Sequence, residues 1–142
     1  MERKASAIWK GSLREGKGSI STDSGILKNT PYSFTTRFEN APGTNPEELI
    51  AAAHAGCFTM ALSGQLAAAK LTADQIATTA TLTLEKLDAG WTISKIHLDV
   101  SARVPEASAE AFQTAAASAE KNCPVSRLLK ADITMTAKLE NG

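Results

Sequence analysis

The feature that most constrains this chain of 142 residues is a long apolar segment in its middle, residues 49–66. Asn45, Pro46 and two glutamates precede this segment and form a helix start. Asn45 suits the N-cap, Pro46 suits the first helical position, and the carboxylates lie at the positive end of the helix dipole. The pattern predicts a helix from Pro46 to about residue 70 that is small or apolar on nearly every side. Such a helix is expected to be central to the fold.

The apolar segment is not predicted to cross a membrane. It contains His54, Gly56, Thr59, Ser63 and Gln65, whereas a membrane span needs ~20 predominantly apolar residues. A buried helix is therefore the favoured interpretation. The N-terminal charges have no apolar stretch behind them, so no signal peptide is predicted and a cytoplasmic location is expected.

Alternation of apolar and polar residues predicts β-strands on both sides of the helix. Three alternating segments precede it, at residues 5–10, 19–22 and 32–38, and predict a β-meander. Five elements are expected after it: two hairpin strands, a helix, a short helix and a final strand, at residues 78–87, 91–104, 109–121, 124–130 and 132–139. A Gly-containing turn joins the hairpin strands, and Ser108 can cap the second helix.

These elements predict one domain over residues 1–142, of the α+β class. It has an N-terminal β-meander, a long central helix, an antiparallel β-hairpin, further helices and a C-terminal strand. Fifteen Lys and Arg residues balance fifteen Asp and Glu residues. Without a net positive field, neither nucleic acid nor an anionic membrane is an expected partner. Many of the apolar residues are alanine, which favours close helix packing, including packing against a second subunit.

The two cysteines are the first candidates for chemistry, because the thiolate is the nucleophile and its pKa depends on the surroundings. Cys123 precedes Pro124 at or near a helix N-cap, where free amides and the helix dipole lower the pKa of a thiol. Cys57 lies in the middle of the apolar helix, where burial raises the pKa of a thiol, so it would react only beside a cation. Local reasoning thus favours Cys123 as the more reactive thiol. The alternative is that both cysteines are buried structural residues.

Two further arrangements involve histidine. His54 and Cys57 are three residues apart and share a helix face, which is compatible with a Cys–His hydrolase. A hydrogen-bonded core histidine is the simpler interpretation of His54. A zinc site built from Cys57, Cys123, His54 and His97 is disfavoured because the chain has no Cys-x-x-Cys or His-x-x-x-His pair. No metal is therefore expected.

Arg37 and Glu47 are the charged residues of interest. Glu47 precedes Cys57 by ten residues, which is ~15 Å of rise on a straight helix. Glu47 and Cys57 therefore cannot touch within one chain, but they could meet across two antiparallel copies of the helix. Taken alone, Glu47 is a helix-start carboxylate and Arg37 a solvated strand charge.

Several motifs make the chain similar to a known family. The main ones are GTNPEEL at residues 43–49, AAHAGCF at residues 52–58 and CPVS at residues 123–126. Shorter matches at residues 16–18, 32–39 and 87–90 extend the likeness over nearly the whole chain. On these residues the chain resembles the OsmC/Ohr family of bacterial hydroperoxide reductases, and its OsmC branch most closely.

The resemblance implies a thiol peroxidase in which Cys57 attacks the peroxide and becomes a sulfenic acid. Cys123 then resolves it as a disulfide. Arg37 and Glu47 match the family's arginine and carboxylate. Arg37 would lower the pKa of Cys57 and polarise the peroxide, and Glu47 would hold the guanidinium. The resemblance therefore reverses the local preference for Cys123 as nucleophile.

The resemblance also implies an intertwined OsmC-like homodimer with active sites at the subunit interface, and no cofactor. The implied substrates are organic hydroperoxides and hydrogen peroxide, reduced to alcohols and water in defence against oxidative and osmotic stress. The implied reductant is a dithiol, dihydrolipoamide carried by lipoylated proteins. Tyr32, Phe34, Phe58 and Met60 are candidates to line an apolar pocket. The alternative from another class is a non-enzymatic stress or binding protein that holds an apolar ligand in an interfacial pocket.

Overall fold

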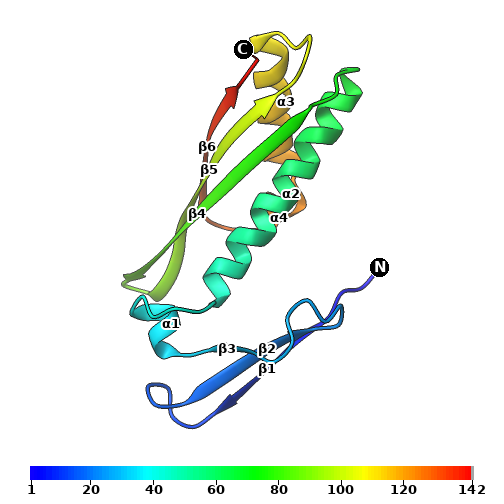
Figure 1. The fold of residues 1–142 in the computed structure, drawn as a ribbon. Coiled ribbons are helices and arrows are strands. Elements are labelled where there is room, and N and C mark those ends of the chain that lie inside the picture. The colour runs from blue at the N-terminus through cyan, green and yellow to red at the C-terminus, as the bar shows by residue number, and fades with distance from the viewer. Residues whose placement is uncertain (142) are drawn as a thin grey trace. The chain divides into compact units, whose positions relative to one another are not determined.

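The computed structural model describes residues 1–141, which divide into two units, Met1–Leu49 and a second unit that begins at Ile50. In the first unit, strands β1 (Ala5–Lys10), β2 (Lys17–Thr22) and β3 (Thr30–Tyr32) form an antiparallel sheet in that order (Figure 1). The predicted β-meander is therefore confirmed.

The expected strand over residues 32–38 is wrong beyond its first residue. Strand β3 ends at Tyr32, and Phe34–Phe38 form a short helix, α1. The Ser33 hydroxyl accepts a hydrogen bond from the Thr36 amide at 3.3 Å, and the Thr36 hydroxyl accepts one from the Ser33 amide at 2.9 Å. This reciprocal capping box satisfies two amides that a helix start leaves free. The cap therefore overrides the alternation that suggested a strand.

Aromatic side chains cover the middle of the first sheet. Gly18 pairs with Trp9 on one side and Tyr32 on the other, and the two rings approach to 5.5 Å between centroids. A Cβ atom at Gly18 would lie 2.5 Å from the Tyr32 ring and 2.6 Å from the Trp9 ring. A glycine is therefore needed here to let the two rings close over the strand.

The remaining elements agree closely with the predicted ones. They are α2, β4, β5, α3, α4 and β6, at Pro46–Ala68, Gln75–Leu87, Gly90–Arg103, Ala109–Asn122, Pro124–Leu128 and Asp132–Leu139. The Asn45 side chain accepts a hydrogen bond from the Glu48 amide at 2.8 Å, and the Ser108 hydroxyl accepts one from the Ala111 amide at 3.1 Å. Both predicted N-caps are confirmed.

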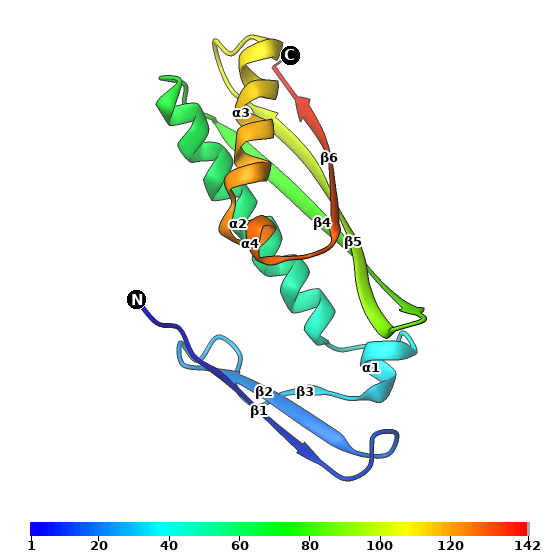
Figure 2. The same cartoon turned by 180° about the vertical axis from the view of Figure 1, so that it is seen from behind.

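The second sheet has the order β4-β5-β6. Strands β4 and β5 form the predicted antiparallel hairpin, while β6 pairs with β5 in parallel. The chain between β5 and β6 therefore returns along the helix layer, where it forms α3 and α4. Figure 2 shows α3 in front of this sheet, and Figure 1 shows it behind the sheet.

The core of the second unit lies between the sheet and the helices. Helix α2 contributes a stripe of residues spaced by four, each with 0% exposure: His54, Phe58, Leu62 and Leu66. Alternate residues of β5 pack here together with a phenylalanine and three alanines of α3: Ile96, Leu98, Val100, Ala102, Phe112, Ala115, Ala116 and Ala119. The alanines let α3 approach closely, as the composition suggested.

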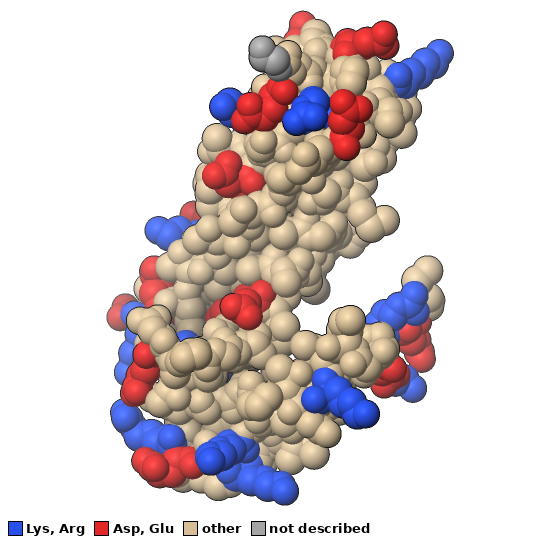
Figure 3. Space-filling model, in the orientation of Figure 1, with Lys and Arg blue, Asp and Glu red and all other residues tan. Residues whose placement is uncertain are grey.

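A single chain buries only one side of α2. Within residues 1–141, α2 is the one helix that is long and apolar enough to span a membrane by length and composition. Only 22% of its 18-residue apolar window is buried inside the chain. Residues 49–69 contain no Lys, Arg, Asp or Glu, and Figure 3 shows an uncharged surface over the middle of the helix. Its exposed positions are mainly small, such as Ala53, Gly56 and Gly64, together with Met60 at 79% exposure. This uncharged side of α2 is available to a partner.

Candidate active site

The second unit brings the two cysteines together. Cys57 projects from α2, and Cys123 stands at the joint where α3 ends and α4 begins. Their sulfur atoms are 2.8 Å apart, although 66 positions separate them in the sequence. Both are free thiols, and Cys123 is fully buried. The pair is therefore placed for disulfide formation without a change of fold.

The surroundings shift the two thiols in opposite directions. Burial raises the pKa of Cys57, the hydrogen bond with Cys123 raises it further, and the Val125 amide partly offsets this. Burial also acts to raise the pKa of Cys123, but hydrogen bonds from Cys57, from the amide and hydroxyl of Ser126 and from the Val125 amide lower it overall. Both directions agree with the local sequence reasoning. Cys57 needs an added positive charge to become the nucleophile.

His54 makes its hydrogen bond with a residue of α4 and not with Cys57, its neighbour on α2. Its Nε2 atom lies 2.7 Å from the Ser126 hydroxyl, and its side chain has 0% exposure. Burial lowers the pKa of His54, which keeps the ring neutral. These contacts are those of a hydrogen-bonded core histidine. They favour that interpretation of His54 over the Cys–His hydrolase.

Ser126 is a site residue to which the sequence reasoning gave no role. It lies in α4, is 9% exposed, and contacts both His54 and Cys123. The available signal was its place in the CPVS motif, three residues after a helix N-cap, where a side chain can reach back to the N-cap residue.

The first unit holds Arg37 and Glu47 as an ion pair. The Arg37 Nε atom lies 3.0 Å from one Glu47 carboxylate oxygen and 3.1 Å from the other, and Arg37 Nη2 lies 2.7 Å from the first oxygen. Glu47 is 9% exposed, whereas the Arg37 side chain is 39% exposed. Asn45 strengthens the arrangement by donating to the Thr36 carbonyl at 3.0 Å. Arg37 is thus a fixed helix cation and not the solvated strand charge expected from its pattern.

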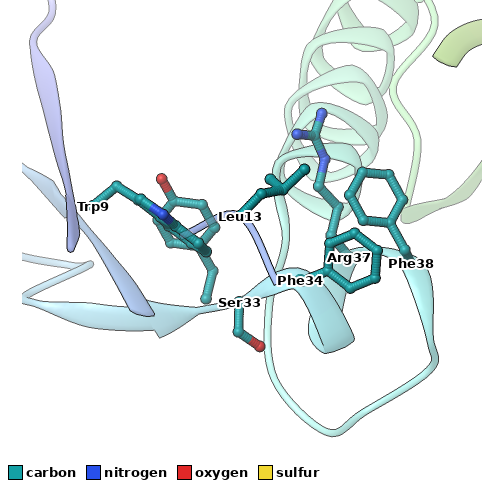
Figure 4. Close-up of a pocket in the computed structure, with 7 residues that line it drawn as sticks. Trp9, Leu13, Ser33, Phe34, Arg37 and Phe38 are labelled. Atoms are coloured by element: carbon teal, nitrogen blue, oxygen red, sulfur yellow. The ribbon is translucent and has the colours of Figure 1, made fainter. Parts of the chain in front are cut away.

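An apolar pocket of about 220 Å³ adjoins this arginine. Seven residues line it: Trp9, Leu13, Tyr32, Ser33, Phe34, Arg37 and Phe38. Figure 4 shows the rings of Phe34 and Phe38 beside the Arg37 side chain. Two of the four predicted pocket residues, Tyr32 and Phe34, are therefore found here. Phe58 belongs to the core of the second unit and Met60 is exposed.

Residues 1–141 contain no cluster of side chains that could bind a metal ion. No group of three or more His, Cys, Asp or Glu side chains there could hold a metal ion. His97 lies on the sheet, where both ring nitrogens meet hydroxyls of β6, those of Thr134 and Thr136.

Comparison with known proteins identifies the family. Residues 38–138 match the model of the OsmC-like protein family. The chain belongs to this family. It is 48% identical over 141 residues to Peroxiredoxin OsmC of Escherichia coli (strain K12), with 99% of each chain covered, and equally to that of Shigella flexneri.

Solved structures share the fold of this OsmC-like chain. An OsmC-like protein of unknown function from Vibrio cholerae matches with a TM-score of 0.76 at 16% identity, covering 96% of this chain and 99% of that one. The organic hydroperoxide resistance protein OhrB of Bacillus subtilis matches with a TM-score of 0.67 at 22% identity, covering 96% and 98%. The α+β class predicted from the sequence is confirmed.

The buried, neutral His54 of this OsmC-like chain gives a stability that depends on pH. Because its pKa is lowered in the folded state, the unfolded chain takes up a proton that the folded chain does not as the pH falls below about 6.5. The free energy of unfolding of the reduced protein should therefore decline below that pH, by at most about 1.4 kcal/mol per pH unit from this group. Urea unfolding at pH 7.5 and 5.5 measures the decline.

The His54→Gln variant should lose this part of the pH dependence, while His97→Gln should retain it. An equal decline in His54→Gln and in the unmodified protein would contradict the assignment to His54.

Proposed function

We propose that this OsmC-like protein is a cysteine-based peroxidase that reduces organic hydroperoxides and hydrogen peroxide. The observation that carries the proposal is the 2.8 Å contact between Cys57 and Cys123. It is supported by the 48% identity to a protein named Peroxiredoxin OsmC. A thiol pair of this kind donates two electrons to one peroxide molecule and becomes a disulfide.

The proposed reaction begins at Cys57. Its thiolate attacks one peroxide oxygen, the O–O bond breaks, and the other oxygen leaves as an alcohol or, from hydrogen peroxide, as water after taking a proton. The sulfur is then a sulfenic acid. The Cys123 thiolate attacks this sulfur, the S–O bond breaks, and the hydroxyl leaves as water with the proton that Cys123 released. A dithiol then restores both thiols by exchange and becomes a disulfide itself.

Arg37 is the proposed source of the positive charge that Cys57 needs. Burial raises the pKa of Cys57, and a guanidinium beside a thiolate lowers it again. The ion pair with Glu47 fixes the plane of the guanidinium, so the same cation can also stabilise the charge on the leaving oxygen. The pocket of about 220 Å³ beside Arg37 would hold the organic part of the hydroperoxide.

We propose that two copies of the chain form the working unit. The uncharged side of α2 supports this, because it is exposed in one chain and rich in small residues. The helix spacing between Glu47 and Cys57 supports sites in which Arg37 and Glu47 of one copy serve Cys57 of the other. The protein would act in the cytoplasm as a single OsmC-like domain per chain. Its reductant would be a dithiol such as dihydrolipoamide on a lipoylated protein.

The first prediction concerns mass. One equivalent of cumene hydroperoxide added to the reduced protein should lower the intact mass by two units, since one disulfide replaces two thiols. Cys57→Ser should abolish peroxide consumption. Cys123→Ser should consume one equivalent and leave a sulfenic acid on Cys57 that dimedone traps. Unchanged mass with two alkylatable thiols would sink the proposal and favour the ligand-binding alternative.

The second prediction concerns the origin of the arginine. Arg37→Ala should slow oxidation of Cys57 by about 100-fold or more, because it removes preorganised charge stabilisation. A mixture is then refolded from equal amounts of two single variants, one carrying Cys57→Ser and the other Arg37→Ala. It should regain about one quarter of the wild-type activity if paired copies share sites. No recovery in the mixture would show that each site takes its arginine from its own chain.

The third prediction concerns the subunit contact. Light scattering should give about 30 kDa, twice the 14.9 kDa of one chain. Met60→Glu places a charge in the middle of the uncharged side of α2 and should shift the mass towards that of one chain. Ala117→Glu, on the exposed side of α3, is the matched control and should leave the mass unchanged. A dimer that survives Met60→Glu would mean that the copies meet elsewhere.

A further inference from the structure

We propose that His54 and Ser126 form a hydrogen-bonded pair that aims the Ser126 hydroxyl at the sulfur of Cys123 and so readies this cysteine to form the disulfide. The inference rests on the proposed function, because it assigns positioning residues to the second step of that reaction. It concerns two buried side chains of the second unit to which the reaction above gives no part.

The first observation is a buried contact between two helices. His54 on α2 and Ser126 on α4 are 72 positions apart, and their Nε2 and Oγ atoms lie 2.7 Å from each other. His54 is 0% exposed and Ser126 is 9% exposed. A hydrogen bond this short and this well buried fixes both side chains, since breaking it would leave polar groups unpaired inside the core.

The second observation sets the direction of the hydrogen bond. The Nδ1 atom of His54 is buried and has no hydrogen-bond partner among residues 1–141. A proton on Nδ1 would therefore be an unpaired buried donor, which proteins avoid more strictly than an unpaired acceptor. The proton of the neutral ring consequently belongs on Nε2, which donates to Ser126. The serine then has its own hydroxyl proton free to donate elsewhere.

The third observation places Cys123 where that proton can go. Cys123 is the N-cap of α4, Ser126 stands three residues further on in the first turn of this helix, and its hydroxyl and amide both hydrogen-bond to the Cys123 sulfur. The hydroxyl and amide of Ser126 both contribute to the lowered pKa of Cys123. The four side chains thus form a connected series from His54 through Ser126 and Cys123 to Cys57. Its two ends, His54 and Cys57, lie three residues apart on the same face of α2.

The chemical consequence falls on the resolving step alone. The sulfenic acid of Cys57 is attacked by the thiolate of Cys123, so the rate depends on how much of Cys123 is deprotonated and on where its lone pair points. A hydroxyl donor held by His54 favours the thiolate and fixes its position. The proton that Cys123 gives up leaves with the Cys57 hydroxyl as water, so His54 and Ser126 are unchanged at the end.

The test separates the two steps by rapid mixing with cumene hydroperoxide, acid quench and mass analysis. Sulfenic acid formation adds about sixteen mass units relative to the reduced chain. Disulfide formation then removes about eighteen, because the hydroxyl and a thiol proton leave as water. Ser126→Ala and His54→Leu should slow the second step by about 10-fold or more and accumulate the sulfenic acid. The first step should stay within about threefold of the unmodified protein.

Three variants distinguish positioning from mere packing. His54→Gln carries an amide N–H at the end of its side chain that can replace Nε2–H, and it should recover much of the second-step rate. Two variants are matched controls. Ser94→Ala removes a buried hydroxyl that has no hydrogen-bond partner within residues 1–141, and His97→Gln removes a histidine bonded to threonines. Both controls should resolve the sulfenic acid at the normal rate.

A second readout follows the thiolate itself. In a Cys57→Ser background Cys123 is the remaining thiol, and its absorbance at about 240 nm reports its pKa. Adding Ser126→Ala should raise that pKa, and adding Ser94→Ala should not. If peroxide leaves the unmodified chain with two alkylatable thiols and no sulfenic acid forms in Ser126→Ala, the proposed function fails. If the sulfenic acid forms but Ser126→Ala and His54→Leu resolve it at the normal rate, only the present inference is overturned.

Discussion

The rotation of α2 about its own axis determines the geometry of the second unit. His54, Phe58, Leu62 and Leu66 lie on one stripe and are fully buried against the rest of the core. Burying these side chains contributes roughly 1.5–3 kcal/mol for each large apolar residue, so the helix cannot turn without exposing them. Cys57 precedes Phe58 and is carried by the same packing to the sulfur of Cys123. The thiol contact is therefore a consequence of the core.

Features set by local sequence were the ones that could be predicted. The caps at Asn45 and Ser108 depend on neighbouring amides, and both are present. The strand expected at residues 32–38 failed because its alternation and its β-branched and aromatic content favour a strand, whereas Ser33 and Thr36 make a reciprocal cap that starts a helix. The parallel direction of β6 could not be predicted either, because alternation is the same in both kinds of sheet.

The candidate site shows the same division. The raised pKa of Cys57 follows first from burial, which its place in an apolar helix indicates. Burial also acts to raise the pKa of Cys123, and its overall lowering depends first on the hydrogen bond with Cys57 and then on Ser126 and Val125 at the start of α4. The pairing of the two thiols came only from the family resemblance, since no spacing rule joins residues 66 positions apart. The contact between His54 and Ser126 had no such guide, because it depends on how α4 packs against α2.

The parallel pairing of β5 with β6 has a consequence for the chemistry of Cys123. The chain between these strands must cross over the sheet, and Cys123 sits in that crossover, held by the sheet at both ends. The conformational entropy of bringing the two sulfurs together is thus lost when the chain folds, and not when the disulfide forms. In the proposed reaction Cys123 would therefore act at the high effective concentration of a preoriented intramolecular group. Small thiols in solution would compete poorly with it for the sulfenic acid of Cys57.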